Sequence, residues 1–196
     1  MPQSQSDIEE IPRDHLLAIL AADAAGYARM MTADGHGAIS ILDGARAVFR
    51  RQIRAQRGRV VDTAGDSVLA VFDSAGAALR AALAVQERLD PALPFRIGLH
   101  LGDVIEKADG TVYGDGVNVA ARLQTLADPG GILVSQAIHS IVATRNLVTF
   151  DDFGSHILKN IAEPVCVWKV RTELYHLRFG CGERFELRSR GSYLLV

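Results

Sequence analysis

The sequence has few cysteines, no long hydrophobic run and no excess of basic residues. Its two cysteines, Cys166 and Cys181, are too few and too late in the chain to build a disulfide framework, so we expect reduced thiols in a cytoplasmic protein. No apolar stretch approaches the ~18 residues that a membrane-spanning helix needs, and the N-terminus is polar and acidic. A net charge of −2 lacks the basic surplus of nucleic-acid binders. We therefore expect neither a membrane nor a nucleic acid as a partner.

The length and composition indicate one ordinary globular domain. The 196 residues are enough for one hydrophobic core and few for two, and 48% hydrophobic with 22% charged residues is typical of such a domain. We expect a flexible leader over residues 1–14 and a single domain over residues 15–171. Residues 172–196 have weak periodicity and many arginines, and we interpret them as a C-terminal appendage.

The hydrophobic pattern predicts strands and helices in an α+β arrangement. The apolar run at 15–23 predicts a buried central strand. Segments 59–63 and 68–72 predict two strands joined by a tight hairpin. This order of elements predicts helices on one side of a largely antiparallel sheet. Further helices are expected at 36–56, 74–89 and 136–143, and further strands at 95–106, 132–135, 147–153 and 165–170.

A polar pair interrupts the helix predicted in the segment TVYGDGVNVAARLQ. Asn118 and Arg122 are four residues apart and share one helix face, whereas Val119, Leu123 and Leu126 form a separate apolar stripe. A helix that only fills a core does not need such a pair. A ligand explains it, and a cap with a surface pair is the alternative.

Two aspartates lie where predicted strands end. Asp23 ends the first strand and is followed by small residues, and Asp66 lies at the tip of the hairpin. If these strands are neighbours, the two carboxylates converge beside free backbone N–H groups. Hard divalent cations prefer such oxygens, and phosphates prefer such amides. Taken alone, each aspartate is more often a turn or cap residue, so the pair by itself is a weak signal.

Four segments taken together resemble the catalytic domain of class III nucleotidyl cyclases, the adenylate and guanylate cyclases. The resemblance spans residues 15–170, and YGDGVNVAARL is its most specific part. It implies a ferredoxin-like α+β domain that converts a nucleoside triphosphate into a 3′,5′-cyclic nucleotide and pyrophosphate. The segments are LAADAAGYARM, GRVVDTAGDSVLAVF, FRIGLHLGDVI and TVYGDGVNVAARL, in that order.

The resemblance also implies roles for individual residues. Asp23 and Asp66 match the carboxylates that hold two divalent cations, Mg²⁺ or Mn²⁺, with help from the carbonyl of Ala24. Asn118 matches the residue that orients the ribose, and Arg122 matches the one that meets charge developing on the α-phosphate. Gly26, Tyr27 and Ala28 match the turn whose amides bind the terminal phosphates. Lys159 lies near the position where the family has a basic residue that contacts the triphosphate.

In this family the active site is shared between two chains. The metal ligands come from one subunit and the Asn/Arg helix from the other, across a two-fold axis. Since this chain contains both halves, the resemblance implies a homodimer with two equivalent sites.

Two positions that read the base in this family differ from both of its common patterns. They are Asp62 and Thr111, where adenylate cyclases typically have Lys with Asp or Thr, and guanylate cyclases have Glu and Cys. A carboxylate repels the N1 acceptor of adenine, whereas guanine N1–H or uracil N3–H would donate to it. Asp62 thus argues against ATP and does not separate GTP from UTP. The alternative is that Asp62 is a solvated acid that reads nothing.

A branch of similar cyclases makes cyclic UMP or CMP as a second messenger in bacterial antiviral defence, often as free-standing domains. From this likeness we expect a pyrimidine cyclase acting chiefly on UTP. The alternatives are a guanylate or adenylate cyclase, or a catalytically silent nucleotide-binding regulator.

Overall fold

The computed structural model describes residues 13–145 and 147–171. In order, its elements are β1 (Arg13–Ala24), α1 (Tyr27–Ala33), α2 (Gly35–Ala55), β2 (Arg59–Asp62), β3 (Ser67–Phe72), α3 (Ala75–Arg88), β4 (Phe95–Glu106), β5 (Val112–Tyr113), α4 (Asp115–Leu126), β6 (Ile132–Ser135), α5 (Gln136–Val142), the 3-10 helix η1 (Ala143–Arg145), β7 (Thr149–His156) and β8 (Val165–Arg171). β1 begins at Arg13, so Asp14 belongs to a strand and not to the expected leader. The remainder of that leader, and the appendage expected over 172–196, lie outside the described residues.

The strands form one mixed sheet in the order β2-β3-β1-β4-β6-β8-β7, with β5 paired to β4. The β4–β6 pair is parallel, and the other pairs in the described part of the chain are antiparallel. β1 is central, as predicted, because its apolar run can be buried on both faces. The expected α+β fold with a largely antiparallel sheet is confirmed.

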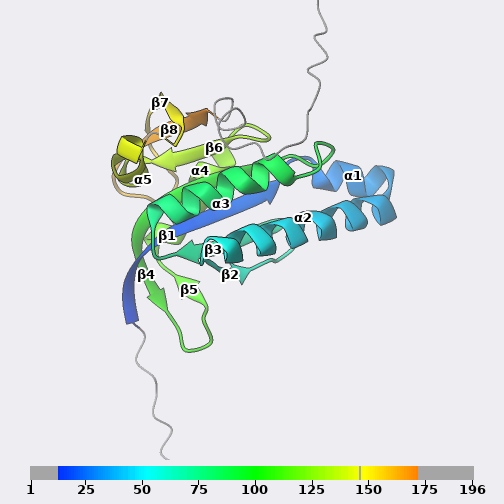
Figure 1. Cartoon of the computed structure of the whole chain (residues 1–196), viewed down its shortest axis with the longest axis horizontal. Coiled ribbons are helices and arrows are strands. Elements are labelled where there is room, and N and C mark those ends of the chain that lie inside the picture. Colours follow the sequence, from blue (N-terminus) through cyan, green and yellow to red (C-terminus); the bar gives the residue numbers. More distant parts are fainter. Residues whose placement is uncertain (1–12, 146, 172–196) are drawn as a thin grey trace, which may run out of the picture.

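Helices cover both faces of the sheet, so the prediction of helices on one side was wrong (Figure 1). Ala18, Leu20 and Ala22 of β1 belong to the core that contains α2, α3 and α5. The alternate residues Leu17 and Ile19 pack with residues of α4 on the opposite face. Continuous hydrophobicity along a strand indicates burial on both sides, and here the second side is covered by α4.

Gly98 of β4 allows α4 to lie unusually close to the sheet. A Cβ added at Gly98 would overlap the carbonyl oxygen of Ala120 and the amide nitrogen of Gln124, both of which are α4 backbone. The position of this glycine therefore sets the distance between α4 and the central strands.

Gly98→Ala should consequently lower the thermal stability of the protein, since α4 must shift to admit the methyl group. Overpacking of this kind costs about 1–3 kcal/mol. The measurement is thermal unfolding followed by circular dichroism, with Gly44→Ala on α2 as the matched control, because nothing lies within 4 Å of a Cβ there. An equal melting temperature for the two variants would contradict the close seating of α4.

No helix in the described ranges is both long and apolar enough to cross a lipid bilayer.

Candidate active site

The two candidate metal ligands, Asp23 and Asp66, lie on neighbouring strands. Asp23 is opposite Ser67 in the antiparallel β1–β3 pair. The N–H of Ala24 donates to the carbonyl oxygen of Asp66 at 3.3 Å, which joins the end of β1 to the β2–β3 turn. The two strands are therefore neighbours, which was the condition for the two aspartates to lie close together.

Asp23 has two partners that the sequence analysis missed. Arg96 lies opposite Asp23 in the β1–β4 pair, and its Nη2 contacts the Asp23 Oδ2 at 2.5 Å. Gln124 Nε2 of α4 donates to the same oxygen at 3.4 Å. Alternation in β4 could have shown that Arg96 points away from the face of Phe95 and Ile97, but only strand pairing reveals its partner.

The segment Gly26, Tyr27, Ala28 follows β1 directly and opens α1. Gly26 has the left-handed φ of 84°, and no side chain caps this helix end. Gly26 and Ala28 are exposed, whereas Tyr27 is partly buried against the main core. The small residues therefore leave the backbone of this turn accessible close to Asp23.

Asp23 and Asp62 line a common cavity of about 400 Å³ between the sheet and α4. From α4, the cavity is lined by Val117, Ala121 and Gln124. Asp62 is exposed at the end of β2, beside an irregularity in the β2–β3 pairing. The structure thus brings one candidate metal ligand and one candidate base contact to the same hollow.

The predicted polar pair on α4 is not among the described residues that line this cavity. Asn118 is exposed, and Arg122 is partly buried with a buried Nε that has no hydrogen-bond partner among the described residues. Of the apolar stripe, Val119 and Leu123 are buried, whereas Leu126 is 38% exposed. Within one chain, the structure therefore does not bring Asn118 and Arg122 to the cavity that Asp23 lines.

Thr111, the second candidate base contact, lies in the turn between β4 and β5, outside the residues that line the cavity of Asp62. Its N–H donates to Asp109 Oδ1 at 2.8 Å, and this bond holds the pKa of Asp109 below its usual value. Arg59 of β2 donates to the carbonyl oxygen of Gly110 at 2.6 Å. Since Gly110 precedes Thr111, this bond joins β2, which ends at Asp62, to the turn that contains Thr111.

Lys159 is exposed in the turn after β7. Its neighbour Leu158 is buried in a cluster with Val119 and Leu123 of α4. Lys159 therefore follows a residue that is anchored beneath the helix of Asn118 and Arg122.

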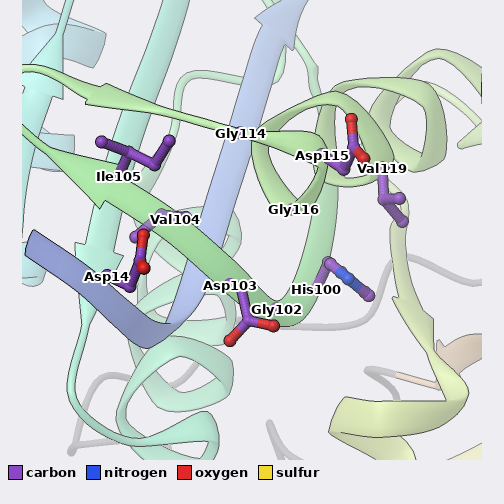
Figure 2. A pocket seen from close by; sticks show the side chains of 10 residues that line it. All are labelled: Asp14, His100, Gly102, Asp103, Val104, Ile105, Gly114, Asp115, Gly116 and Val119. Atoms are coloured by element: carbon purple, nitrogen blue, oxygen red, sulfur yellow. The ribbon is translucent and has the colours of Figure 1, made fainter.

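A second cavity, of about 850 Å³, lies on another flank of α4 and contains none of the predicted site residues (Figure 2). Its lining includes His100 together with the carboxylates of Asp14, Asp103 and Asp115. Burial lowers the pKa of His100 to about 4, and its Nδ1 is 2.8 Å from Ser135 Oγ. His100 is therefore neutral at physiological pH.

The chemistry of the candidate donors is compatible with a divalent cation only if other ligands join them. Within residues 13–145 and 147–171, no group of three or more His, Cys, Asp or Glu side chains is arranged to hold a metal ion. Asp23, Asp66 and the carbonyl of Ala24 offer oxygen ligands that suit Mg²⁺ or Mn²⁺, but fewer than the six that such ions take. Phosphate oxygens and water must supply the others, as is usual where Mg²⁺ binds together with a nucleotide.

Comparison with known proteins gives matches over most of the chain. Residues 10–177 match the model of the adenylate and guanylate cyclase catalytic domain. A putative adenylate cyclase 3 of Rhizobium meliloti (strain 1021) is 41% identical over 170 residues, which are 82% of this chain and 29% of that protein. An adenylate cyclase of Streptomyces coelicolor is 32% identical over 149 residues, which are 72% of this chain and 38% of that protein. The chain thus spans well under half of these two relatives.

A solved structure is similar over nearly its whole length. The crystal structure of an adenylate/guanylate cyclase/hydrolase from Silicibacter pomeroyi has 38% sequence identity and a TM-score of 0.75. The match covers 82% of this chain and 98% of that one.

Proposed function

Since the chain belongs to the family of adenylate and guanylate cyclase catalytic domains, we propose that it converts ATP into 3′,5′-cyclic AMP and pyrophosphate as a two-fold dimer. The observation that supports the reaction most strongly is that the β2–β3 turn with Asp66 adjoins the end of β1, where Asp23 lines a cavity of about 400 Å³. The choice of ATP is supported by the relatives, which are named adenylate cyclases.

This proposal replaces the expectation of a UTP cyclase in antiviral defence, because the named relatives favour ATP. The hydrogen-bond argument against ATP assumed a buried Asp62, for which a mismatched partner costs about 1–3 kcal/mol. Asp62 is exposed in the chain, where water can satisfy its carboxylate. The penalty against adenine is correspondingly small, and the carboxylate alone does not exclude ATP.

Asp23 and Asp66 would hold the divalent cations, with the carbonyl of Ala24 as a further ligand. Such cations, when bound, lower the pKa of the ribose 3′-hydroxyl and neutralise charge on the triphosphate. The open turn at Gly26 and Ala28 would accept the terminal phosphates through its amides. The work of these residues is positioning and charge stabilisation, which dominate phosphoryl transfer.

Arg96 would exchange partners during binding. It pairs with the Asp23 carboxylate, and a divalent cation on Asp23 would compete for the same oxygens. The displaced guanidinium has a planar set of donors that suits phosphate oxygens. We therefore assign Arg96 to the triphosphate once the substrate is bound.

Asn118 and Arg122 would act on the substrate held by a second copy of the chain. Class III cyclases act as dimers, and neither side chain lines the cavity of Asp23 in its own chain. A two-fold axis then generates two identical composite sites. Asn118 orients the ribose in this scheme, and Arg122 stabilises charge at the α-phosphate. Lys159, which follows the Leu158 that packs against α4, would contribute a positive charge for the triphosphate.

The proposed substrate is tested by giving the purified protein equal ATP, GTP, CTP and UTP with Mn²⁺ and identifying the cyclic product by mass spectrometry. We expect 3′,5′-cyclic AMP as the main product, together with an equal amount of pyrophosphate. An Asp66→Asn preparation, purified in parallel, reports any contaminating cyclase. Dominant cyclic UMP would restore the argument from Asp62, and no product from any nucleotide would favour a silent regulator.

A further inference from the structure

The β2–β3 turn that leads into Asp66 is open and sparsely packed. Gly65 has a left-handed φ of 58°, and a Cβ added there would meet nothing within 4 Å. Inside the turn, the N–H and Oγ of Ser67 donate to the carbonyl oxygen of Ala64 at 3.1 and 2.8 Å. Towards β1, the turn is joined by the 3.3 Å bond from Ala24 to Asp66. Packing alone therefore does little to fix this turn.

One side chain of α2 holds the turn from the other side. Arg46 Nη2 donates to the carbonyl oxygen of Thr63 at 3.3 Å and to that of Gly65 in a shorter bond. Arg46 Nη1 contacts Asp43 Oδ1 at 3.2 Å, which orients the guanidinium. α2 itself is anchored in the core by residues such as Phe49, which is fully buried.

We propose that Arg46 is a positioning residue for the cyclase reaction. By bonding to the carbonyls on either side of Ala64, it fixes the turn and thereby the direction of the Asp66 carboxylate, which would hold the divalent cations. The inference rests on the proposed function for the role of Asp66. Arg46 acts through Asp66 and is not itself a ligand of the metal or the nucleotide.

The chemistry of the contact explains why an arginine stands here. A planar guanidinium presents several donors in a fixed fork, so it can hold two carbonyls of one turn at once, whereas a lysine is a single point charge on a flexible stem. The Arg46 side chain is only 25% exposed. Its Nε is buried without a hydrogen-bond partner among the described residues. Burying such a donor is unfavourable, so the bonds of Nη1 and Nη2 must compensate for it.

The test compares Arg46→Ala and Arg46→Lys with Arg50→Ala. Arg50 is exposed one helical turn further along α2, so its variant removes the same charge from the same helix. Hydrogen–deuterium exchange should show faster exchange of residues 63–67 in both Arg46 variants than in Arg50→Ala, with the remaining sheet unchanged. Arg46→Lys keeps the charge, so it separates positioning from a general electrostatic effect.

Cation affinity gives the second readout. Binding of Mn²⁺ is followed by electron paramagnetic resonance in the presence of 3′-deoxy-ATP, which lacks the attacking hydroxyl. Loss of a residue that orients a metal ligand typically weakens metal binding or activity about 10- to 100-fold. We expect a loss of affinity of about 10-fold in both Arg46 variants and none in Arg50→Ala. Exchange and Mn²⁺ affinity equal to those of Arg50→Ala would overturn the inference, as would normal behaviour of Arg46→Lys alone.

The two proposals fail separately. A wild-type protein that makes no cyclic nucleotide would contradict the proposed function. Exchange in residues 63–67 and Mn²⁺ affinity, compared between the Arg46 and Arg50 variants, would still decide whether Arg46 fixes the turn.

Discussion

Replacing Arg122 with alanine should lower kcat by about 10²–10³-fold and change the KM for ATP much less. The reason is that the guanidinium would meet charge that develops only in the transition state, and losing one such donor costs ~2.7–4 kcal/mol. Steady-state assays with Mg²⁺ or Mn²⁺ measure the effect. Thr125→Ala, a change at an exposed position one turn away on α4, is the matched control.

The split between kcat and KM distinguishes this role from simple substrate binding. Removal of an interaction made equally in the ground state and the transition state raises KM and leaves kcat unchanged. A kcat of Arg122→Ala within a few-fold of the wild-type value would contradict the assignment. Raised KM alone would move Arg122 to a binding role.

The second large effect is expected from Asp66→Asn. An amide of the same shape lacks the charge that retains a divalent cation, so the electrostatic stabilisation supplied by that cation is lost. A loss of about 4 kcal/mol corresponds to about 10³-fold in rate. Activity is measured over a range of Mn²⁺ concentrations, and Asp73→Asn, at an exposed position after β3, is the control. Activity and Mn²⁺ dependence equal to those of Asp73→Asn would show that Asp66 is dispensable for the reaction.

A mixture of these two inactive proteins tests the shared site directly. Co-refolded or exchanged subunits of Asp66→Asn and Arg122→Ala form mixed dimers in which one site receives both mutations and the other receives neither. Random pairing predicts about one quarter of the wild-type activity. If the mixture is as inactive as its components, each site is built from a single chain.

The sequence alone was sufficient for the elements with strong local patterns. The apolar run at 15–23 predicted the central strand, and the helical spacing of residues such as Phe49 and Ile53 predicted α2, which ends at Ala55. The adjacency of Asp23 and Asp66 followed from placing two strand ends side by side. The strand and the helix depend on residues close together in the chain, whereas Asp23 and Asp66 are distant in sequence and were expected to meet only if their strands are neighbours.

Features that depend on distant residues were missed. Arg96 is 73 positions from Asp23, and Arg46 is 19 positions from Gly65, so neither contact has a periodic signature. The placement of α4 on the second face of the sheet was missed for a similar reason. It depends on the absence of a side chain at Gly98 and on the apolar residues of β1 that alternate with the main core, such as Ile19. The exposure of Asp62 was missed as well, because a sequence does not state solvent accessibility.

The ion pair between Arg96 and Asp23 also has a consequence for how the enzyme assembles its ligands. Because Arg96 supplies a counter-charge for Asp23, we expect the fold to persist without a cation, so a chelator should leave the protein intact. A free ion arriving at Asp23 must displace a bound guanidinium, whereas an ion that arrives already chelated by ATP brings phosphates for that guanidinium to take. The order of addition that this favours is the metal–nucleotide complex first, with uncomplexed metal following it.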